Sequence, residues 1–282
     1  PVVTVGRFTS PDTMASQVKR GVVDFIGAAR PSIADPFLPR KIDEGRLSDI
    51  RECIGCNICY TGDGLGVPIR CTQNPTMGEE WRRGWHPEFI AKKGSESSVL
   101  VVGAGPAGLE ATRALGQRGY RVTLAEATRE LGGRVTRESK LPGLSEWQRV
   151  RDYRLQQIDV MPNVEVFRES ELSVDEVLAV EADHIVFATG ATWRADGFGR
   201  SHLHPLTTLS SGARILTPDD IMAGHLPDGP TVIFDDDSFY MGGVIAEQVR
   251  CANVPVLVVT PENVVSAWCE YTSEQYQVQK HL

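Results

Sequence analysis

Short apolar runs alternate along the chain with longer amphipathic stretches. The runs are rich in valine, isoleucine and leucine and are bounded by glycine, proline or charged residues. Strands buried on both faces of a parallel sheet have this composition, and the stretches between them have helical periodicity. The pattern predicts an α/β fold of successive β-α-β units. We expect strands at residues 1–5, 22–26, 98–102, 121–125, 184–188, 230–234 and 254–259.

The pattern of the first fifty residues predicts a strand, a helix and a second strand, followed by a polar helical stretch. Ser10 and Pro11 mark the start of the helix, as N-cap and first helical residue. Each strand runs into a turn that carries an arginine, and these turns supply the candidate residues Gly6, Arg7, Ala29 and Arg30. In (β/α)8 barrels the loops after the last strands commonly form a phosphate site. The alternative is that both arginines are surface residues of a simple β-α-β unit.

A glycine-rich loop follows the strand at 98–102, with the pattern G-x-G-x-x-G. A helix pattern continues to Arg118, and the next strand ends at Glu126, at the spacing expected of a dinucleotide-binding unit. The glycines allow a tight turn, close approach of a pyrophosphate and close helix packing, while Glu126 accepts from a ribose hydroxyl. The sequence therefore predicts a site for ADP or an adenine dinucleotide that includes Gly103, Ala104, Gly105, Ala107, Gly108 and Glu126.

Two later features extend this site, and a second unit follows it. A Gly132-Gly133-Arg134 turn lies after Glu126, and the strand at 184–188 ends in Thr189-Gly190. We therefore add Gly133, Arg134, Thr189 and Gly190 to the predicted nucleotide site. From residue 229 another strand, turn and helix begin, but Asp235, Asp236 and Asp237 stand where a phosphate loop needs glycine amides. Clustered carboxylates repel a pyrophosphate, so we expect no NAD(P)H there.

Composition and charge narrow the class of protein. The chain has 282 residues, of which 41% are hydrophobic and 23% charged, and a net charge of −8. These values are ordinary for a globular protein and argue against a nucleic-acid or membrane-surface partner. We find no apolar run of the ~20 residues needed to span a bilayer, and no charged and then apolar leader. We expect a cytoplasmic location, and we expect the chain to be a piece of a longer protein because both ends interrupt a pattern.

The main candidate for chemistry is a group of closely spaced cysteines. Cys53, Cys56 and Cys59 are separated by two residues each, and Cys71 follows after eleven more. Iron–sulfur clusters are held by four thiolates, and closely spaced runs are one way to supply three of them. A zinc site more often uses two separate pairs, and nothing suggests the oxidising compartment of a disulfide. We predict that residues 60–70 form a loop, and that the remaining cysteines, Cys251 and Cys269, are buried free thiols.

Taken together, these motifs resemble the trimethylamine/dimethylamine dehydrogenase family of iron–sulfur flavoproteins, with the 2,4-dienoyl-CoA reductases as relatives. The resemblance covers the whole chain, and is most specific at Cys53–Cys59, at Cys71-Thr-Gln-Asn, at Gly84-Trp-His-Pro and at the 103–108 loop. The spacing of the second and third cysteines resembles the amine branch, since the reductases tend to have three residues there.

The resemblance implies a set of cofactors and their ligands. It implies FMN on the barrel with its phosphate at Arg7 and Arg30, a [4Fe-4S] cluster beside it, and ADP or FAD at the glycine loop. In the amine branch a small secondary or tertiary amine is oxidised at FMN, and electrons leave one at a time through the cluster to an electron-transfer flavoprotein. Barrel strands one to six and the catalytic residues are missing, so this chain alone is not expected to oxidise an amine. We also expect a homodimer.

The predicted organisation has four segments. Residues 1–50 are the end of an FMN-binding (β/α)8 barrel, 51–95 the cluster segment, 96–228 an ADP- or FAD-binding Rossmann-like domain, and 229–282 the start of a degenerate NAD(P)-like domain. Two other functions stay open at this point. One is an NADPH-dependent enoyl reductase of the 2,4-dienoyl-CoA reductase type, and the other is an electron-carrier module without substrate chemistry.

Overall fold

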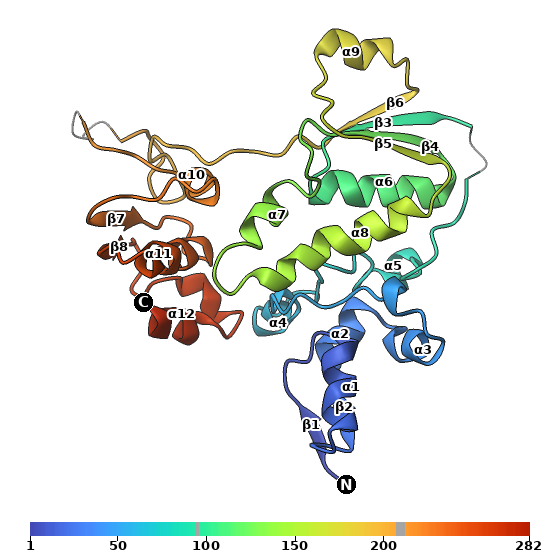
Figure 1. Ribbon diagram of the computed structural model, residues 1–282, viewed down its shortest axis with the longest axis horizontal. Coiled ribbons are helices and arrows are strands. Elements are labelled where there is room, and N and C mark those ends of the chain that lie inside the picture. The colour runs from blue at the N-terminus through green and yellow to red at the C-terminus, as the bar shows by residue number, and fades with distance from the viewer. Residues whose placement is uncertain (94–95, 207–211) are drawn as a thin grey trace. The chain divides into compact units, whose positions relative to one another are not determined.

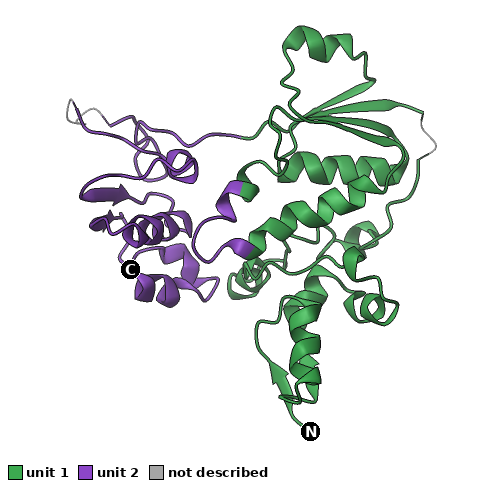
Figure 2. Cartoon of the chain, viewed as in Figure 1, with its two compact units in different colours: residues 1–136, 146–190 green, residues 137–145, 191–282 purple. Residues whose placement is uncertain are grey.

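The computed structural model describes residues 1–93, 96–206 and 212–282. The described chain divides into two compact units, residues 1–136 with 146–190 and residues 137–145 with 191–282 (Figure 2). The four-segment organisation stays a prediction, and its residues 94–95 and 207–211 lie outside the described residues.

The first unit begins with a parallel strand pair. Strand β1 (Val3–Val5) pairs with β2 (Phe25–Gly27), and helix α1 (Pro11–Lys19) connects them (Figure 1). Pro11 occupies the first helical position, as predicted, because its fixed φ suits that position and its missing N–H is not needed there. The second strand begins three residues later than predicted, since Val22 and Asp24 lie in bends before it. A parallel pair joined by a helix is the repeating unit of a (β/α) fold.

Two short helices and a turn lead from β2 to the cysteines. They are α2 (Ala29–Ala34), α3 (Leu38–Asp43) and the 3-10 turn η1 (Leu47–Asp49). Lys41 is fully buried, and its ammonium lies 2.7 Å from Asp35 Oδ2, which also accepts a hydrogen bond from the backbone N–H of Arg51. This buried pair ties α3 to the start of the cysteine segment. Lys41 also pairs with Glu88, whereas removing Lys41 would leave the buried carboxylate of Asp35 without its counterion, a change of about 3–5 kcal/mol.

The segment between the third and fourth cysteines is helical at its start, so the prediction of a loop over residues 60–70 was wrong for its first half. Helix α4 (Ile58–Gly64) begins after Asn57, whose φ of 56° turns the chain sharply. Gly62 lies against the returning backbone, because a Cβ there would be 3.1 Å from Ile69 Cα. The glycines that suggested a loop serve this close turn instead. Helix α5 (Glu80–Arg83) follows the fourth cysteine.

A four-stranded parallel sheet forms the core of the first unit, in the order β5-β4-β3-β6. The strands are β3 (Ser98–Val102), β4 (Arg121–Ala125), β5 (Val164–Phe167) and β6 (His184–Phe187). This order is that of a Rossmann-like fold, and it confirms the predicted α/β class. The bounds of β3 and β4 are those predicted, whereas β5 was not predicted.

Helices cover both faces of this sheet. Helices α6 (Pro106–Arg118) and α8 (Arg149–Asp159) pack side by side on one face, and α9 (Val174–Ala179) lies on the other (Figure 1). On the first face Val99, Val101 and Leu124 pack with Leu109 of α6 and with Ile158 of α8. Between β4 and α8 come α7 (Arg134–Glu138) and the turn η2 (Ser145–Gln148).

The second unit contains a second parallel pair, β7 (Thr231–Phe234) and β8 (Val256–Val259), joined by α11 (Met241–Cys251). It also contains α10 (Pro218–Met222), the turn η3 (Ala267–Glu270) and α12 (Gln275–His281). The predicted strand–helix–strand order is therefore present here. Within the three described ranges, no helix has both the length and the apolar character that crossing a membrane requires.

Candidate cofactor sites

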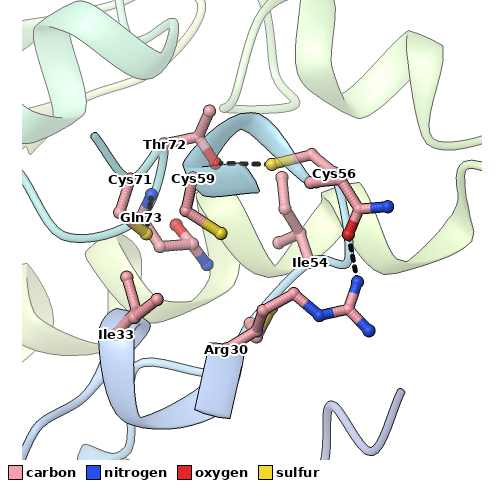
Figure 3. Close-up of a pocket in the computed structure, with 10 residues that line it drawn as sticks. Arg30, Ile33, Ile54, Cys56, Cys59, Cys71, Thr72 and Gln73 are labelled. Atoms are coloured by element: carbon pink, nitrogen blue, oxygen red, sulfur yellow. Dashed lines mark hydrogen bonds between the residues drawn. The ribbon is translucent and has the colours of Figure 1, made fainter. Parts of the chain in front are cut away.

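The four closely spaced cysteines line one small cavity in the first unit (Figure 3). Cys53 and Cys56 come from the turn before α4, Cys59 from α4 itself and Cys71 from the chain that returns after it. Ile33 and Ile54 supply its apolar wall. The tertiary structure thus brings the predicted set Cys53, Cys56, Cys59 and Cys71 together around a common space.

Polar hydrogens point at several of the sulfurs. The backbone N–H of Gly55 donates to Cys53 Sγ at 3.3 Å, and that of Gln73 donates to Cys71 Sγ at 3.4 Å. Thr72 Oγ1 lies 3.1 Å from Cys56 Sγ (Figure 3). Gly55 can present its N–H in this way because its φ of 70° suits glycine. Such contacts stabilise negative charge on sulfur and tune a bound metal centre.

The surroundings of these thiols favour their neutral form. Burial raises the pKa of Cys53, Cys59 and Cys71 above the ordinary value, and the other cysteines of the group raise it further. The positive charge of Arg30 acts in the opposite direction at Cys53 and Cys59. A metal that binds here must therefore displace protons from buried thiols.

The donor set distinguishes between kinds of metal centre. Among the described residues, no group of three or more histidine, cysteine, aspartate or glutamate side chains is placed to hold a metal ion. The four cysteines nevertheless surround one cavity. In a [4Fe-4S] cluster each thiolate binds a different iron atom, so the sulfurs surround an extended body rather than one ion. The all-cysteine cavity fits such a cluster better than it fits a single tetrahedral zinc.

The two predicted arginines both reach the cysteine segment. Arg7 follows Gly6 and β1, has a φ of 50°, and donates to the carbonyl oxygen of Gly55 at 3.0 Å. Arg30 follows Ala29 in α2, donates to Asn57 Oδ1 and lines the cysteine cavity (Figure 3). The planar N–H donors of a guanidinium match the geometry of phosphate oxygens, so both side chains have the chemistry to bind an anion. Residues after both strands thus lie against the cysteine site.

The glycine loop has the geometry that its sequence pattern predicts. Gly103 has a φ of 99°, and a Cβ there would lie 2.5 Å from the carbonyl oxygen of Ala188. Gly108 packs so closely under this turn that a Cβ would collide with the carbonyl oxygen of Gly103. A Cβ at Gly105 would meet no atom within 4 Å, so the backbone there is open to an approaching phosphate.

Glu126 stands beside this loop. Its Oε2 accepts a hydrogen bond from the backbone N–H of Ala104 at 2.8 Å, and its Oε1 accepts from Thr128 at 2.9 Å. Gly133 approaches from the other side, since a Cβ there would lie 3.0 Å from Gly105 Cα. The structure therefore gathers Gly103, Ala104, Gly105, Glu126 and Gly133 at the carboxyl ends of β3 and β4.

The other predicted nucleotide residues lie around the same loop. Ala107 is exposed in the first turn of α6, and Arg134 begins α7. Thr189 and Gly190 are exposed after β6, and the backbone of Thr189 comes near Gly103. Gly190 has a φ of 77°, a conformation that favours glycine. Ligands of open parallel sheets bind at such carboxyl ends, next to the first strand of the unit.

The corresponding turn of the second unit is filled by a carboxyl group. Asp235 follows β7, is 3% exposed, and packs against the first turn of α11, where a Cβ on Gly242 would lie 2.6 Å from its Oδ2. Burial raises the pKa of Asp235. Asp236 faces elsewhere, because its Oδ1 accepts from the backbone N–H of Ser201 at 2.9 Å. The buried Asp235 thus fills the turn between β7 and α11.

Several residues of the cysteine site were not predicted. Asn57, Thr72 and Gln73 line the cavity, and Arg149 donates to the carbonyl oxygen of Cys53 at 2.9 Å. Neither a short motif nor a periodic pattern marks these residues, because they meet the cysteines only through the fold. The Thr-Gln pair after Cys71 was noted only for its resemblance to a family.

Comparison with protein families defines the class of this chain. Residues 1–49 match the NADH:flavin oxidoreductase / NADH oxidase family, and residues 97–216 match the pyridine nucleotide-disulphide oxidoreductase family. The first match includes Arg7 and Arg30, and the second includes the glycine loop and Glu126. Fold, sites and matches together define a flavoprotein of the oxidoreductase class.

Individual relatives narrow this class to proteins similar to amine dehydrogenases. Dimethylamine dehydrogenase from Hyphomicrobium sp. (strain x) is 43% identical to this chain over 99% of it and 39% of that protein. The structure of histamine dehydrogenase from Rhizobium sp. 4-9 is 56% identical, with a TM-score of 0.93, over 100% of this chain and 41% of that one. The structure of the 6-hydroxypseudooxynicotine amine oxidase of Pseudomonas geniculata N1 is 52% identical, with a TM-score of 0.91, over 99% of this chain and 42% of that one. The chain is similar to these proteins over nearly all of its length, and it spans about two fifths of theirs.

Proposed function

We propose that this chain is the electron-transfer and nucleotide-binding part of a flavin-dependent amine dehydrogenase, and that it holds a [4Fe-4S] cluster. The observation that carries this proposal is the cavity lined by Cys53, Cys56, Cys59 and Cys71. When bound, the cluster supplies one-electron transfer. The four thiolates hold it, while the N–H groups of Gly55 and Gln73 stabilise negative charge on the ligand sulfurs.

The remaining residues bind the two nucleotide cofactors. Arg7 and Arg30 bind the phosphate of FMN through charge-assisted hydrogen bonds from their guanidinium groups. Both arginines also contact the cysteine segment, at Gly55 and Asn57, which supports a flavin close to the cluster. The 103–108 loop binds the pyrophosphate of ADP or FAD at the start of α6, and Glu126 accepts from a ribose hydroxyl.

The substrate and the electron acceptor belong to the longer protein and its partner. Relatives named for dimethylamine, for histamine and for an amine oxidase support a small amine as the substrate. An electron-transfer flavoprotein is the proposed acceptor, and a homodimer the proposed assembly. The buried Asp235 argues against the NADPH-dependent enoyl-reductase alternative, because its carboxyl group fills the turn after β7, where a phosphate loop needs glycine amides.

The test is metal analysis of anaerobically reconstituted protein. We expect about four irons and four acid-labile sulfides per chain, the content of one [4Fe-4S] cluster. Cys56→Ser removes one ligand and should lower both contents strongly. Cys251→Ser is the matched control, since Cys251 is exposed on α11 and outside the cavity. One zinc per chain without sulfide would contradict the proposal.

A further inference from the structure

Gln73 holds both ends of the cysteine segment. It is 1% exposed, and its backbone N–H donates to Cys71 Sγ at 3.4 Å. Its side-chain amide donates to the carbonyl oxygen of Glu52, the residue before Cys53, at 3.0 Å. One residue therefore contacts the last cysteine directly and the first through its neighbour.

Arg154 of α8 in turn holds Gln73. Its Nη1 donates to Gln73 Oε1 at 2.9 Å, and its Nη2 donates to the carbonyl oxygen of Gln73 at 3.4 Å. Arg154 is 4% exposed and spans 81 positions of sequence to make these contacts. The forked guanidinium fixes both the side chain and the backbone of Gln73, which a single donor could not do.

The charge of Arg154 is balanced by a carboxylate from the nucleotide-binding helix. Arg154 Nε lies 2.8 Å from Glu110 Oε2, and Arg113 Nη2 lies 2.6 Å from Glu110 Oε1. Burial lowers the pKa of Arg154, yet a guanidinium remains charged at neutral pH. Burial works against the charge of Glu110 as well, but Arg113 and Arg154 outweigh it and lower the pKa of this carboxyl.

These contacts form one continuous path from α6 to the cysteines. Glu110 lies in the turn of α6 that follows the glycine loop, and α6 packs along α8, which carries Arg154 (Figure 1). Gln73 then links Arg154 to Cys71. All of these residues belong to the first unit.

We propose that Gln73, Arg154 and Glu110 are positioning residues for the cysteine site, and that the Arg154–Glu110 pair sets the reduction potential of the bound cluster. This inference rests on the proposed function, because it needs a cluster at the four cysteines. It assigns part of the electrostatic control of the cluster to helices of the nucleotide-binding fold rather than to the cysteine segment itself.

The sign of the effect follows from charge. Reduction of the cluster by dithionite adds one electron and hence one negative charge. A nearby buried cation stabilises that charge, and a nearby buried anion opposes it, with little screening by salt. Removing the charge of Arg154 should therefore lower the potential, and removing the charge of Glu110 should raise it. Simple damage to the fold gives no such pair of opposite shifts.

The experiment measures iron and sulfide first, and then titrates the cluster anaerobically, with the EPR signal of the reduced state as the readout. At the wild-type midpoint potential we expect Arg154→Gln to lower the ratio of reduced to oxidised cluster about threefold to tenfold. This is the size of effect expected when one partly screened buried charge is removed. Glu110→Gln should raise this ratio by a similar factor. Arg154→Lys keeps the charge but loses the forked contact with Gln73, so its ratio should lie closer to the wild type than that of Arg154→Gln. Arg121→Gln and Glu165→Gln change the same charges at exposed positions of β4 and β5 and serve as controls.

The outcomes separate this inference from the proposed function. A wild-type chain without iron and sulfide overturns the proposed function and this inference with it. A chain that holds the cluster but has the same potential in Arg154→Gln and Glu110→Gln overturns only the inference. The inference is also overturned if both variants shift the potential in the same direction and lose iron, since that result indicates structural support alone. If Arg154→Gln does not fold, Glu110→Gln decides, because it keeps the shape of the pair.

Discussion

At the scale of single residues, the six cysteines have three different environments. Four line the common cavity, Cys269 is 1% exposed in η3, and Cys251 is exposed at the end of α11. The prediction that both remaining cysteines are buried was right for Cys269 and wrong for Cys251. Cys251 follows the buried Val249 by two positions, which turns it away from the apolar side of the helix.

This difference predicts different reactivity of the two thiols. Burial raises the pKa of Cys269 to about 12, so at about pH 8 it holds almost no thiolate, the form that reacts. Titration with dithionitrobenzoate should therefore show one fewer fast-reacting thiol in Cys251→Ser and no change in Cys269→Ser. The cavity cysteines contribute equally to both variants. A smaller fast-reacting count in Cys269→Ser would mean that η3 opens readily in solution.

At the scale of elements, the β3–α6 turn is built to approach a phosphate closely. Its three glycines have different structural roles. Gly103 makes the turn, Gly108 permits the close packing of α6, and the space beside the Gly105 backbone is open. The open space is what a pyrophosphate needs, whereas the other two positions are occupied by backbone. A side chain at Gly105 therefore interferes with a ligand and not with the fold.

Gly105→Leu should abolish binding of ADP while the cysteine site keeps its iron content. Isothermal titration with ADP measures the first effect and iron analysis the second. Gly229→Leu is the matched control, since a Cβ at Gly229 also meets nothing within 4 Å but lies outside the loop. Unchanged affinity for ADP in Gly105→Leu would place the nucleotide site elsewhere in the chain.

At the scale of the whole molecule, the two compact units differ in their predicted ligands. The glycine loop, Glu126 and Gly190 all belong to the first unit, and the aspartate-filled turn belongs to the second. Compact units of one chain commonly unfold as separate transitions. Ligands should therefore act on one transition and leave the other unchanged.

Calorimetry can test this division. ADP at a hundred times its dissociation constant should stabilise the first unit by about 2.7 kcal/mol and raise its transition temperature. The transition of the second unit should not move, either with ADP or with NADH, because the carboxyl group of Asp235 fills the turn after β7 there. A shift of the second transition by NADH would contradict the assignment of that unit and favour the enoyl-reductase alternative.

Local pattern was sufficient for much of this protein. The apolar runs located β3 and β4 to the residue, Gly119 marked the end of α6 with its φ of 95°, and the acid after β4 was identified from spacing alone. The cysteine spacing identified all four cysteines that line the cavity. These features are visible in sequence because each depends on neighbours within one strand, turn or helix.

Other features of the site depend on residues that are far apart in the chain. Arg154 reaches Gln73 across 81 positions, Arg7 reaches Gly55 across 48, and Glu126 meets Ala104 across 22. Of these contacts only the last follows from a known motif. A buried guanidinium bonds to whichever carbonyl or carboxylate the packing of helices presents, so its partner cannot be read from local pattern. The sequence by itself determined which residues are candidates to bind cofactors and which strands carry them. Only the tertiary structure decided what surrounds the four cysteines, because those contacts form when α6, α8 and the cysteine segment pack together.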